Sequence, residues 1–251
     1  MKIVGIIPAR LASTRFPGKP LAKIHGRPMI EHVYRRAQRA DLIHELYIAT
    51  CDEEIAAETE KFGAKVIMTS SAHTRCTDRV AEAAENIDAD IVINIQGDEP
   101  LIDPEAIDES ISIMKNNKFR CLNWITPIKE WEVFISQNTV KTAIGKDNKI
   151  LYFSRQPIPT SGQENLKNAF KQMGVYIFRK QFLLQYSSWQ EMPLEKAEKV
   201  DMLRILEHGF DIKAFITKDM IGVDTPEDLS LVEQILLEDP LHNKIFKTSH
   251  R

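Results

Sequence analysis

Short apolar runs that alternate with amphipathic segments limit most strongly how this 251-residue chain can fold. In the run KIVGII at 2–7 no residue after Lys2 is polar, which is typical of a parallel strand buried on both faces. After Pro28 the apolar residues recur instead at helical spacing. The first half therefore predicts strands at 2–7, 46–50, 65–70 and 90–96, and helices at 29–37, 53–63, 77–87 and 103–115. Such alternation predicts an open, mostly parallel sheet with helices on both faces.

Residues 118–180 interrupt this alternation, because they hold strand-like runs with few helical signals between them. We interpret them as an inserted β-rich lobe within one α/β domain that spans residues 1–251. The strands expected there lie at 120–128, 139–145, 149–154 and 173–178. One helix at 193–209 that ends at a glycine, a strand at 211–216 and a helix at 225–237 complete the domain. We expect the polar residues after 237 to form a partly ordered tail.

Composition excludes several classes of protein. The net charge of −3 gives no global positive field, and no apolar run approaches the roughly 18 residues of a membrane span, so we expect neither a nucleic-acid partner nor membrane insertion. The first apolar run is too short for a signal peptide and Arg10 interrupts it. Three cysteines without C-x-x-C spacing are typical of reduced thiols, and we expect a cytoplasmic protein.

One loop concentrates positive charge where α/β sheets bind ligands. Residues after the first strand include Arg10, Ser13, Thr14, Arg15 and Lys19. Ligands of open α/β sheets bind beyond the carboxyl ends of the strands, and three cations beside backbone amides can hold a polyphosphate. The spacing matches neither the Walker A loop nor the G-x-G-x-x-G dinucleotide loop. A solvated loop whose cations pair with surface carboxylates stays the alternative.

Two carboxylates are predicted to face the same edge of the sheet. Asp98 follows a buried strand in VINIQGDEP, and Asp224 follows a short apolar run in GVDTPEDL. Either residue could instead cap a helix. Mg²⁺ is usually held by one or two carboxylates together with substrate phosphates. The two acids and the cationic loop therefore predict a metal–triphosphate site.

Six long motifs resemble those of the 3-deoxy-manno-octulosonate cytidylyltransferases, or CMP-Kdo synthetases. In order over about residues 2–235 they are IPARLASTRFPGKPLAKIHGRPMIEHVYRRA, VINIQGDEPLIDP, VKTAIGKDNKILYFSRQPIP, GVYIFR, LRILEHG and GVDTPEDL. The resemblance implies a nucleotide-diphospho-sugar transferase-like three-layer α/β sandwich, with the β-rich lobe pairing two subunits in a homodimer. It also implies that CTP and the 2-keto-3-deoxy sugar acid Kdo give CMP-Kdo and pyrophosphate, with Mg²⁺ as cofactor, for lipopolysaccharide or another surface glycan.

The same resemblance assigns roles to individual residues. The catalytic positions would be Arg10, Lys19 and Asp98. The nucleotide would be bound by Arg10, Ser13, Lys19, Thr77, Arg79 and Gln96. The sugar acid would contact Gln172, Tyr176, Asp201, Met202 and Arg204. The metal ligands would be Asp98 and Asp224.

The chain departs from the family pattern in four motifs. Cys51 replaces an acid after the second strand, and Arg75 and Cys76 replace a small residue and a glycine beside the cytosine. On the sugar side, Gln172 replaces a histidine, and Asp201 and Met202 replace a glutamate and a glutamine. We therefore expect unchanged transferase chemistry with an altered acceptor pocket. The alternatives are a related acceptor, such as an amino-Kdo or a nonulosonic acid, and a catalytically silent nucleotide-binding paralogue.

Overall fold

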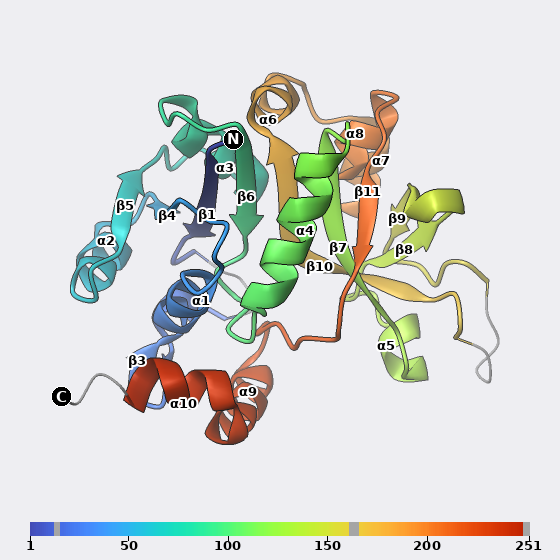
Figure 1. Ribbon diagram of the computed structural model, residues 1–251. Coiled ribbons are helices and arrows are strands. Elements are labelled where there is room, and N and C mark those ends of the chain that lie inside the picture. The colour runs from blue at the N-terminus through green and yellow to red at the C-terminus, as the bar shows by residue number, and fades with distance from the viewer. Residues whose placement is uncertain (13–15, 161–165, 248–251) are drawn as a thin grey trace.

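The computed structural model describes residues 1–12, 16–160 and 166–247, and a central sheet dominates it (Figure 1). Seven strands lie side by side in the order β11-β7-β10-β6-β1-β4-β5. Along the chain they are β1 (Ile3–Ala9), β4 (Glu45–Thr50), β5 (Lys65–Met68), β6 (Ile91–Ile95), β7 (Cys121–Pro127), β10 (Phe170–Arg179) and β11 (Lys213–Ile216). Only β10 among them runs opposite to its neighbours, β6 and β7. The expected mostly parallel sheet is thus confirmed.

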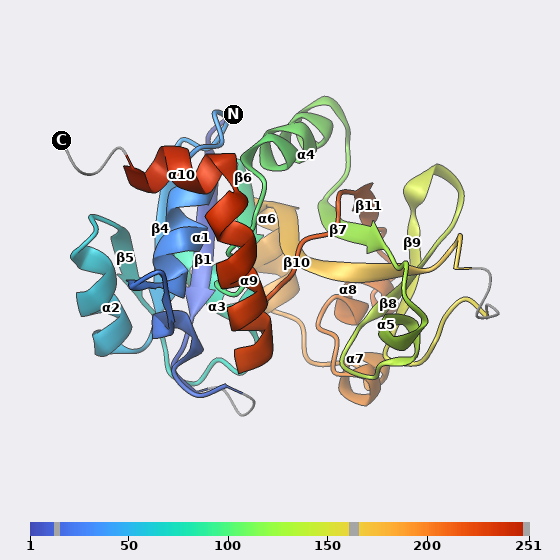
Figure 2. The same ribbon diagram turned by 90° about the horizontal axis from the view of Figure 1, so that it is seen from below.

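Helices cover both faces of this sheet, which gives three layers (Figure 2). One face packs against α1 (Met29–Ala37) and α4 (Pro104–Asn116). The other packs against α3 (Cys76–Glu85), α6 (Lys180–Ser187) and α8 (Leu203–Glu207). Every residue of β1 is buried because both faces are covered, which explains the unbroken apolar run in its sequence. Smaller elements at the edges are η1 (Lys19–Leu21), β2 (Lys23–Ile24), β3 (Arg27–Pro28) and α2 (Glu53–Glu60).

The expected β-rich lobe at 118–180 is only partly separate from the sheet. Its first and last strands, β7 and β10, belong to the central sheet, because the long β10 runs through both regions. The part that projects comprises β8 (Lys141–Ile144), β9 (Ile150–Ser154), the short helix α5 (Trp131–Ile135) and the turn η2 (Lys146–Asn148) (Figure 2). Pairing of two subunits through this projection stays a prediction.

The prediction of a single helix at 193–209 is wrong. The segment forms two helices, α7 (Pro193–Glu198) and α8, with a break between them. Lys199 adopts a left-handed backbone conformation, with φ 56° and ψ 40°, and this ends α7. The Glu198 carboxylate accepts hydrogen bonds from Ser154 Oγ (2.7 Å) and from the Arg155 amide (2.8 Å). The break is therefore held to β9 by partners that helical periodicity does not reveal.

The C-terminal residues also differ from expectation. After α9 (Pro226–Glu238), the residues expected as a partly ordered tail form α10 (Pro240–Lys247), which packs on α1. A partly buried ion pair between Arg36 of α1 and Asp239 (2.5 Å) holds the start of α10, and the ring of His242 stacks on that of His32. These contacts are tertiary, so the polar sequence alone did not indicate them. No helix within the described ranges has the length and apolar character needed to cross a membrane.

Candidate active site

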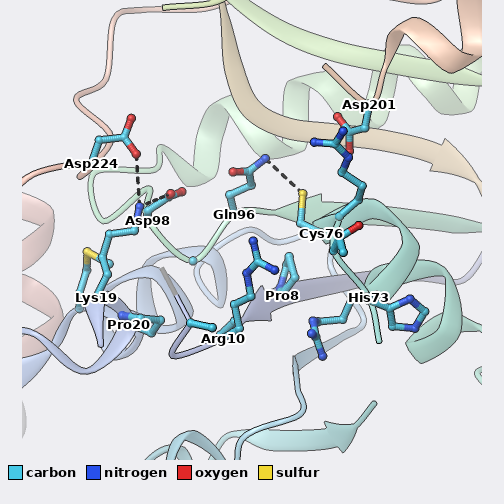
Figure 3. A pocket seen from close by; sticks show the side chains of 17 residues that line it. Pro8, Arg10, Lys19, Pro20, His73, Cys76, Gln96, Asp98, Asp201 and Asp224 are labelled. Atoms are coloured by element: carbon cyan, nitrogen blue, oxygen red, sulfur yellow. Dashed lines mark hydrogen bonds and ion pairs between the residues drawn. The ribbon is translucent and has the colours of Figure 1, made fainter. Parts of the chain in front are cut away.

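A cleft of about 750 Å³ opens at the carboxyl ends of β1, β5 and β6 (Figure 3). Its lining comes from the connections after these strands, the start of α3, the connection before α8 and the connection before the helix at 226–238. It includes Arg10, Lys19, His73, Arg75, Cys76, Arg79, Gln96, Asp98, Asp201 and Asp224. The expectation that the cationic loop and the strand-end acids meet at one sheet edge is confirmed. Ser13, Thr14 and Arg15 of the same loop lie outside the described residues.

Lys19 lies between the two acids that were expected to bind a metal. Its Nζ is 2.6 Å from Asp98 Oδ2 and 3.4 Å from Asp224 Oδ1 (Figure 3). It also donates to the Val223 carbonyl at 2.7 Å. Burial by itself would lower the pKa of Lys19, but the carboxylates of Asp98 and Asp224 outweigh it and raise the pKa above the usual value. Lys19 therefore stays a cation at the floor of the cleft.

The two acids do not act as helix caps, which was the alternative for each. The helix after Asp98, α4, is capped by Asp103, whose side chain accepts from the Glu105 amide. The helix after Asp224, α9, begins with a capping box between Thr225 and Asp228. Both Asp98 and Asp224 instead line the cleft.

The donor set at this point suits Mg²⁺. Asp98 and Asp224 come from loops 126 positions apart in sequence, since they occupy positions 98 and 224, yet both reach the Lys19 ammonium. Carboxylate oxygens are hard ligands, and Mg²⁺ is held by one or two of them together with substrate phosphates and water. Among the residues that the structure describes, no group of three or more His, Cys, Asp or Glu side chains is placed to hold a metal. A bound metal would thus draw its other ligands from substrate.

The side of the cleft expected to bind the base is built around Cys76 and Gln96. Gln96 Nε2 donates to Cys76 Sγ (3.5 Å) and to the hydroxyl of Tyr176 (3.2 Å). Burial of the thiol raises the pKa of Cys76 to about 12, so it stays protonated. Arg79 also lines the cleft, and its guanidinium donates to Cys51 Sγ (3.5 Å) and to the Ser70 carbonyl (3.3 Å). The two cysteines that depart from the family pattern therefore both contact residues of this wall.

A second cleft of about 600 Å³ joins the first one. The two share four lining residues, namely Gln96, Asp98, Asp201 and Asp224. The second cleft is also lined by Gln172 and Tyr176, as expected for the acceptor side, and by Arg155 and Lys171. Sequence analysis assigned no role to Arg155, although it lies within the motif KILYFSRQPIP. Two ligands could therefore lie in adjacent clefts with the acids between them.

Three residues assigned by resemblance do not line either cleft. Thr77 is buried, and its hydroxyl donates to Asp201 Oδ2 at 2.7 Å. Met202 is fully buried and packs in the core beneath the sheet. Arg204 is 3% exposed, pairs with Glu195 through two bonds of 2.7 Å and lies 3.2 Å from Asp78. The placement of Met202 and Arg204 favours structural roles over contact with a sugar acid.

Glu99 is a residue of the second cleft to which the sequence analysis gave no role. Its side chain is buried, and Oε1 accepts a hydrogen bond from the Gly174 amide at 3.1 Å. Desolvation and the charge of Asp98 raise the pKa of Glu99 to about 8. A Cβ at position 174 would lie only 2.9 Å from Oε1, so the glycine permits this close approach. The carboxyl thereby holds β10 against the loop after β6.

Lys19→Ala should lower kcat/KM for CTP by about 100-fold, because the ammonium would contact phosphates in both the ground state and the transition state. The acceptor KM should change little. Steady-state kinetics of pyrophosphate release would measure both values. Lys23→Ala is the matched control, since Lys23 lies nearby but is exposed and pairs with Glu58. A Lys19 variant that keeps CTP affinity and loses acceptor affinity would assign the cation to the other cleft.

Comparisons with known proteins show the family to which the chain belongs. The sequence profile of the family described as Cytidylyltransferase matches residues 4–214. A 3-deoxy-manno-octulosonate cytidylyltransferase of Geobacter metallireducens is 45% identical, over 94% of this chain and 98% of that protein. One of Thermodesulfovibrio yellowstonii is 41% identical, over 94% and 98%.

A solved structure allows the folds themselves to be compared. It is described as CMP:2-keto-3-deoxy-manno-octonic acid synthetase complexed with CTP, and it superposes with a TM-score of 0.89 at 36% identity. The match covers 95% of this chain and 99% of that one. A 4-diphosphocytidyl-2C-methyl-D-erythritol synthase of Anaerococcus prevotii, 18% identical with a TM-score of 0.65, shares the fold alone. The chain therefore belongs to the cytidylyltransferase family and, within it, to the CMP-Kdo synthetases.

Proposed function

We propose that this protein transfers a cytidylyl group from CTP to the sugar acid Kdo, giving CMP-Kdo and pyrophosphate. The observation that carries the proposal is the pair of adjoining clefts that share Asp98 and Asp224. The first cleft has the cations for a triphosphate, and the second has hydrogen-bonding groups for a polyol. The names of its relatives and the CTP complex of the similar structure support the same reaction.

In this reaction the anomeric hydroxyl of the sugar acid attacks the α-phosphorus of CTP, and pyrophosphate leaves. Arg10 and Lys19 line the first cleft and would neutralise the charge that builds on the phosphate oxygens. Gln96 and Tyr176 line the junction and would orient the two substrates. The chain mainly positions and neutralises, so the chemistry requires no separate strong base.

Asp98 and Asp224 would hold Mg²⁺ in this proposal. When bound, the ion supplies charge neutralisation on the phosphates and can acidify the attacking hydroxyl. Lys19 Nζ lies between the two carboxylates. If both carboxylates bind the ion, this ammonium loses its partners and would bind a phosphate oxygen instead. Loss of activity on chelation with EDTA and its return with added Mg²⁺ would test this assignment.

The kcat/KM for CTP should exceed that for UTP by at least about 100-fold. A site built to pair with the amino group of cytosine rejects uracil, which has a carbonyl there. This expectation assumes that Cys76 only replaces a tolerated glycine in the wall of the first cleft. Side-by-side kinetics with the two nucleotides would measure the ratio. Equal use of UTP would mean that Arg75 and Cys76 have changed the base pocket.

A panel assay of pyrophosphate release from CTP tests the function directly. Kdo, an amino-Kdo and a nonulosonic acid would be offered separately, with no acceptor as the baseline. Release that depends on Kdo supports the proposal. Release only with another acid supports the related-acceptor alternative. Gln172 and Asp201 favour that alternative, because both depart from the family pattern on the sugar side of the site. No release with any acid, together with retained CTP binding, would favour the silent paralogue.

We further propose a cytoplasmic homodimer that supplies activated Kdo for lipopolysaccharide or another surface glycan. The projecting strands β8 and β9 with α5 are the surface proposed to pair the subunits. Exposed apolar side chains on this projection, Ile135 and Leu151, support that choice. Light scattering coupled to size-exclusion chromatography should give twice the chain mass, and Leu151→Lys should reduce it toward the monomer.

A further inference from the structure

A buried asparagine lies behind the second cleft, and both polar atoms of its side chain have hydrogen-bond partners. Asn123 of β7 is 0% exposed. Its Nδ2, which has two hydrogens to donate, lies within hydrogen-bond distance of three carbonyl oxygens, those of Trp124 (3.1 Å), Met173 (3.1 Å) and Val175 (3.0 Å). The carbonyls of Met173 and Val175 belong to the part of β10 where its register against β7 shifts, between Gln172 and Tyr176. Since three carbonyl oxygens would repel Oδ1, the amide of Asn123 has one possible orientation.

This orientation determines that of Gln172. Asn123 Oδ1 faces the side chain of Gln172 and accepts from its Nε2 at 2.9 Å. The opposite orientation of Gln172 would place two carbonyl oxygens against each other. Gln172 lines the second cleft, and among the described residues none donates to its Oε1. The amide of Gln172 is therefore held with its nitrogen toward the protein and its oxygen available to a ligand.

We propose that Asn123 is a positioning residue that makes Gln172 an obligate hydrogen-bond acceptor, so that the second cleft selects a sugar acid with a donor at the matching position. This inference rests on the proposed function and adds the chemistry by which the acceptor is recognised. A hydroxyl or an ammonium group can donate to Oε1. A hydrogen, a fluorine or a carbonyl at the same carbon cannot. A pocket of this kind accepts both Kdo and an amino-Kdo while rejecting the analogue that lacks the donor.

The specificity test uses Kdo analogues in which one hydroxyl at a time is replaced by hydrogen or by fluorine. With the natural protein, replacement at one position should lower kcat/KM by about 10-fold or more, equally for hydrogen and fluorine. In Gln172→Met the penalty at that position should fall below about 3-fold, while penalties at other positions persist. Gln185→Met, the same change on the exposed surface of α6, should leave the pattern unchanged. Full activity with the fluorine analogues, or an unchanged pattern in Gln172→Met, would overturn the proposal.

The role of Asn123 is separated from a purely structural one by a double-mutant cycle. Asn123→Ser should lower the melting temperature, because buried carbonyls lose their donor, and should raise the KM for Kdo with little change in kcat. In the Gln172→Met background the thermal loss should persist and the KM effect should vanish. A KM effect that stays in that background would show that Asn123 does not act through Gln172.

A measurement without substrate keeps the geometry testable if Asn123→Ser does not fold or if Kdo is not turned over. Gln172→Glu should melt roughly 5 °C below Gln172→Met near pH 8, because a carboxylate oxygen then faces Asn123 Oδ1. Equal melting temperatures would contradict the assigned amide orientation. A natural protein that ignores Kdo would refute the proposed function, and this thermal comparison would still decide whether Asn123 fixes the amide of Gln172 with its oxygen toward the cleft.

Discussion

Asp98→Asn is expected to lower kcat at least about 100-fold while the fold is retained, the scale on which loss of one charge stabiliser of a transition state acts. The amide is nearly isosteric with the carboxylate, so packing is preserved. It cannot supply the negative charge that would hold Mg²⁺ with Asp224. It also removes the shorter of the two ion pairs that hold Lys19, at 2.6 Å.

The measurement is kcat with saturating Mg²⁺, together with a titration of the Mg²⁺ dependence. Asp103→Asn is the matched control, because Asp103 is a carboxylate of the same connection between β6 and α4 that serves only as a helix cap. Asparagine caps helices as well as aspartate does, so this control should change little. Turnover of Asp98→Asn near that of the natural protein would show that Asp98 is not a metal ligand.

Arg204→Met is expected to destabilise the protein by about 3–5 kcal/mol, because it leaves the buried carboxylate of Glu195 without its partner. The two bonds between Arg204 and Glu195 lie where neither side chain reaches solvent, at 3% and 0% exposure. Burial by itself would lower the pKa of Arg204, but the hydrogen bond to Glu195 together with the nearby charges of Tyr186, Asp78 and Glu195 outweighs it and raises the pKa, so the guanidinium stays charged. A loss of this size corresponds to a fall of roughly 10 °C in melting temperature for a domain of this length.

A second substitution distinguishes an ion-pair role from sugar binding. In Arg204→Met with Glu195→Leu most of the stability should return, since a buried ion pair can be replaced by apolar residues at little cost. The KM for the acceptor, measured well below the melting temperature, should stay within about 3-fold of the natural value. A stable Arg204→Met protein with a strongly raised acceptor KM would restore Arg204 as a sugar ligand.

Some of the residues that depart from the family pattern line the clefts, and others lie in the core. Cys76 and Gln172 line the clefts and can contact substrate. Met202 packs in the core, so its replacement of a polar residue changes the interior beneath the cleft. The altered acceptor pocket is therefore expected to owe its specificity to Gln172 and Asp201.

Local sequence by itself determined the α/β architecture and the edge of the sheet that carries the site. The apolar run of β1 and the helical spacing after Pro28 are short-range patterns, and they were sufficient to predict the layers. Because all parallel strands end at one edge, the positions of Lys19 and Asp98 after β1 and β6 already implied proximity. Their direct contact was not implied, since it depends on side-chain packing.

Tertiary structure decided the features whose partners are far away in the sequence. The break after α7 depends on Glu198 bonding to β9, and α10 depends on the ion pair between Arg36 and Asp239, 203 positions apart. Besides Glu195, the buried Arg204 also bonds to Asp78, 126 positions away. The orientation of Gln172 depends on an asparagine in the neighbouring strand, 49 positions away. Periodicity and motifs report what a residue prefers locally, whereas these interactions exist only after the folded chain has brought the partners together.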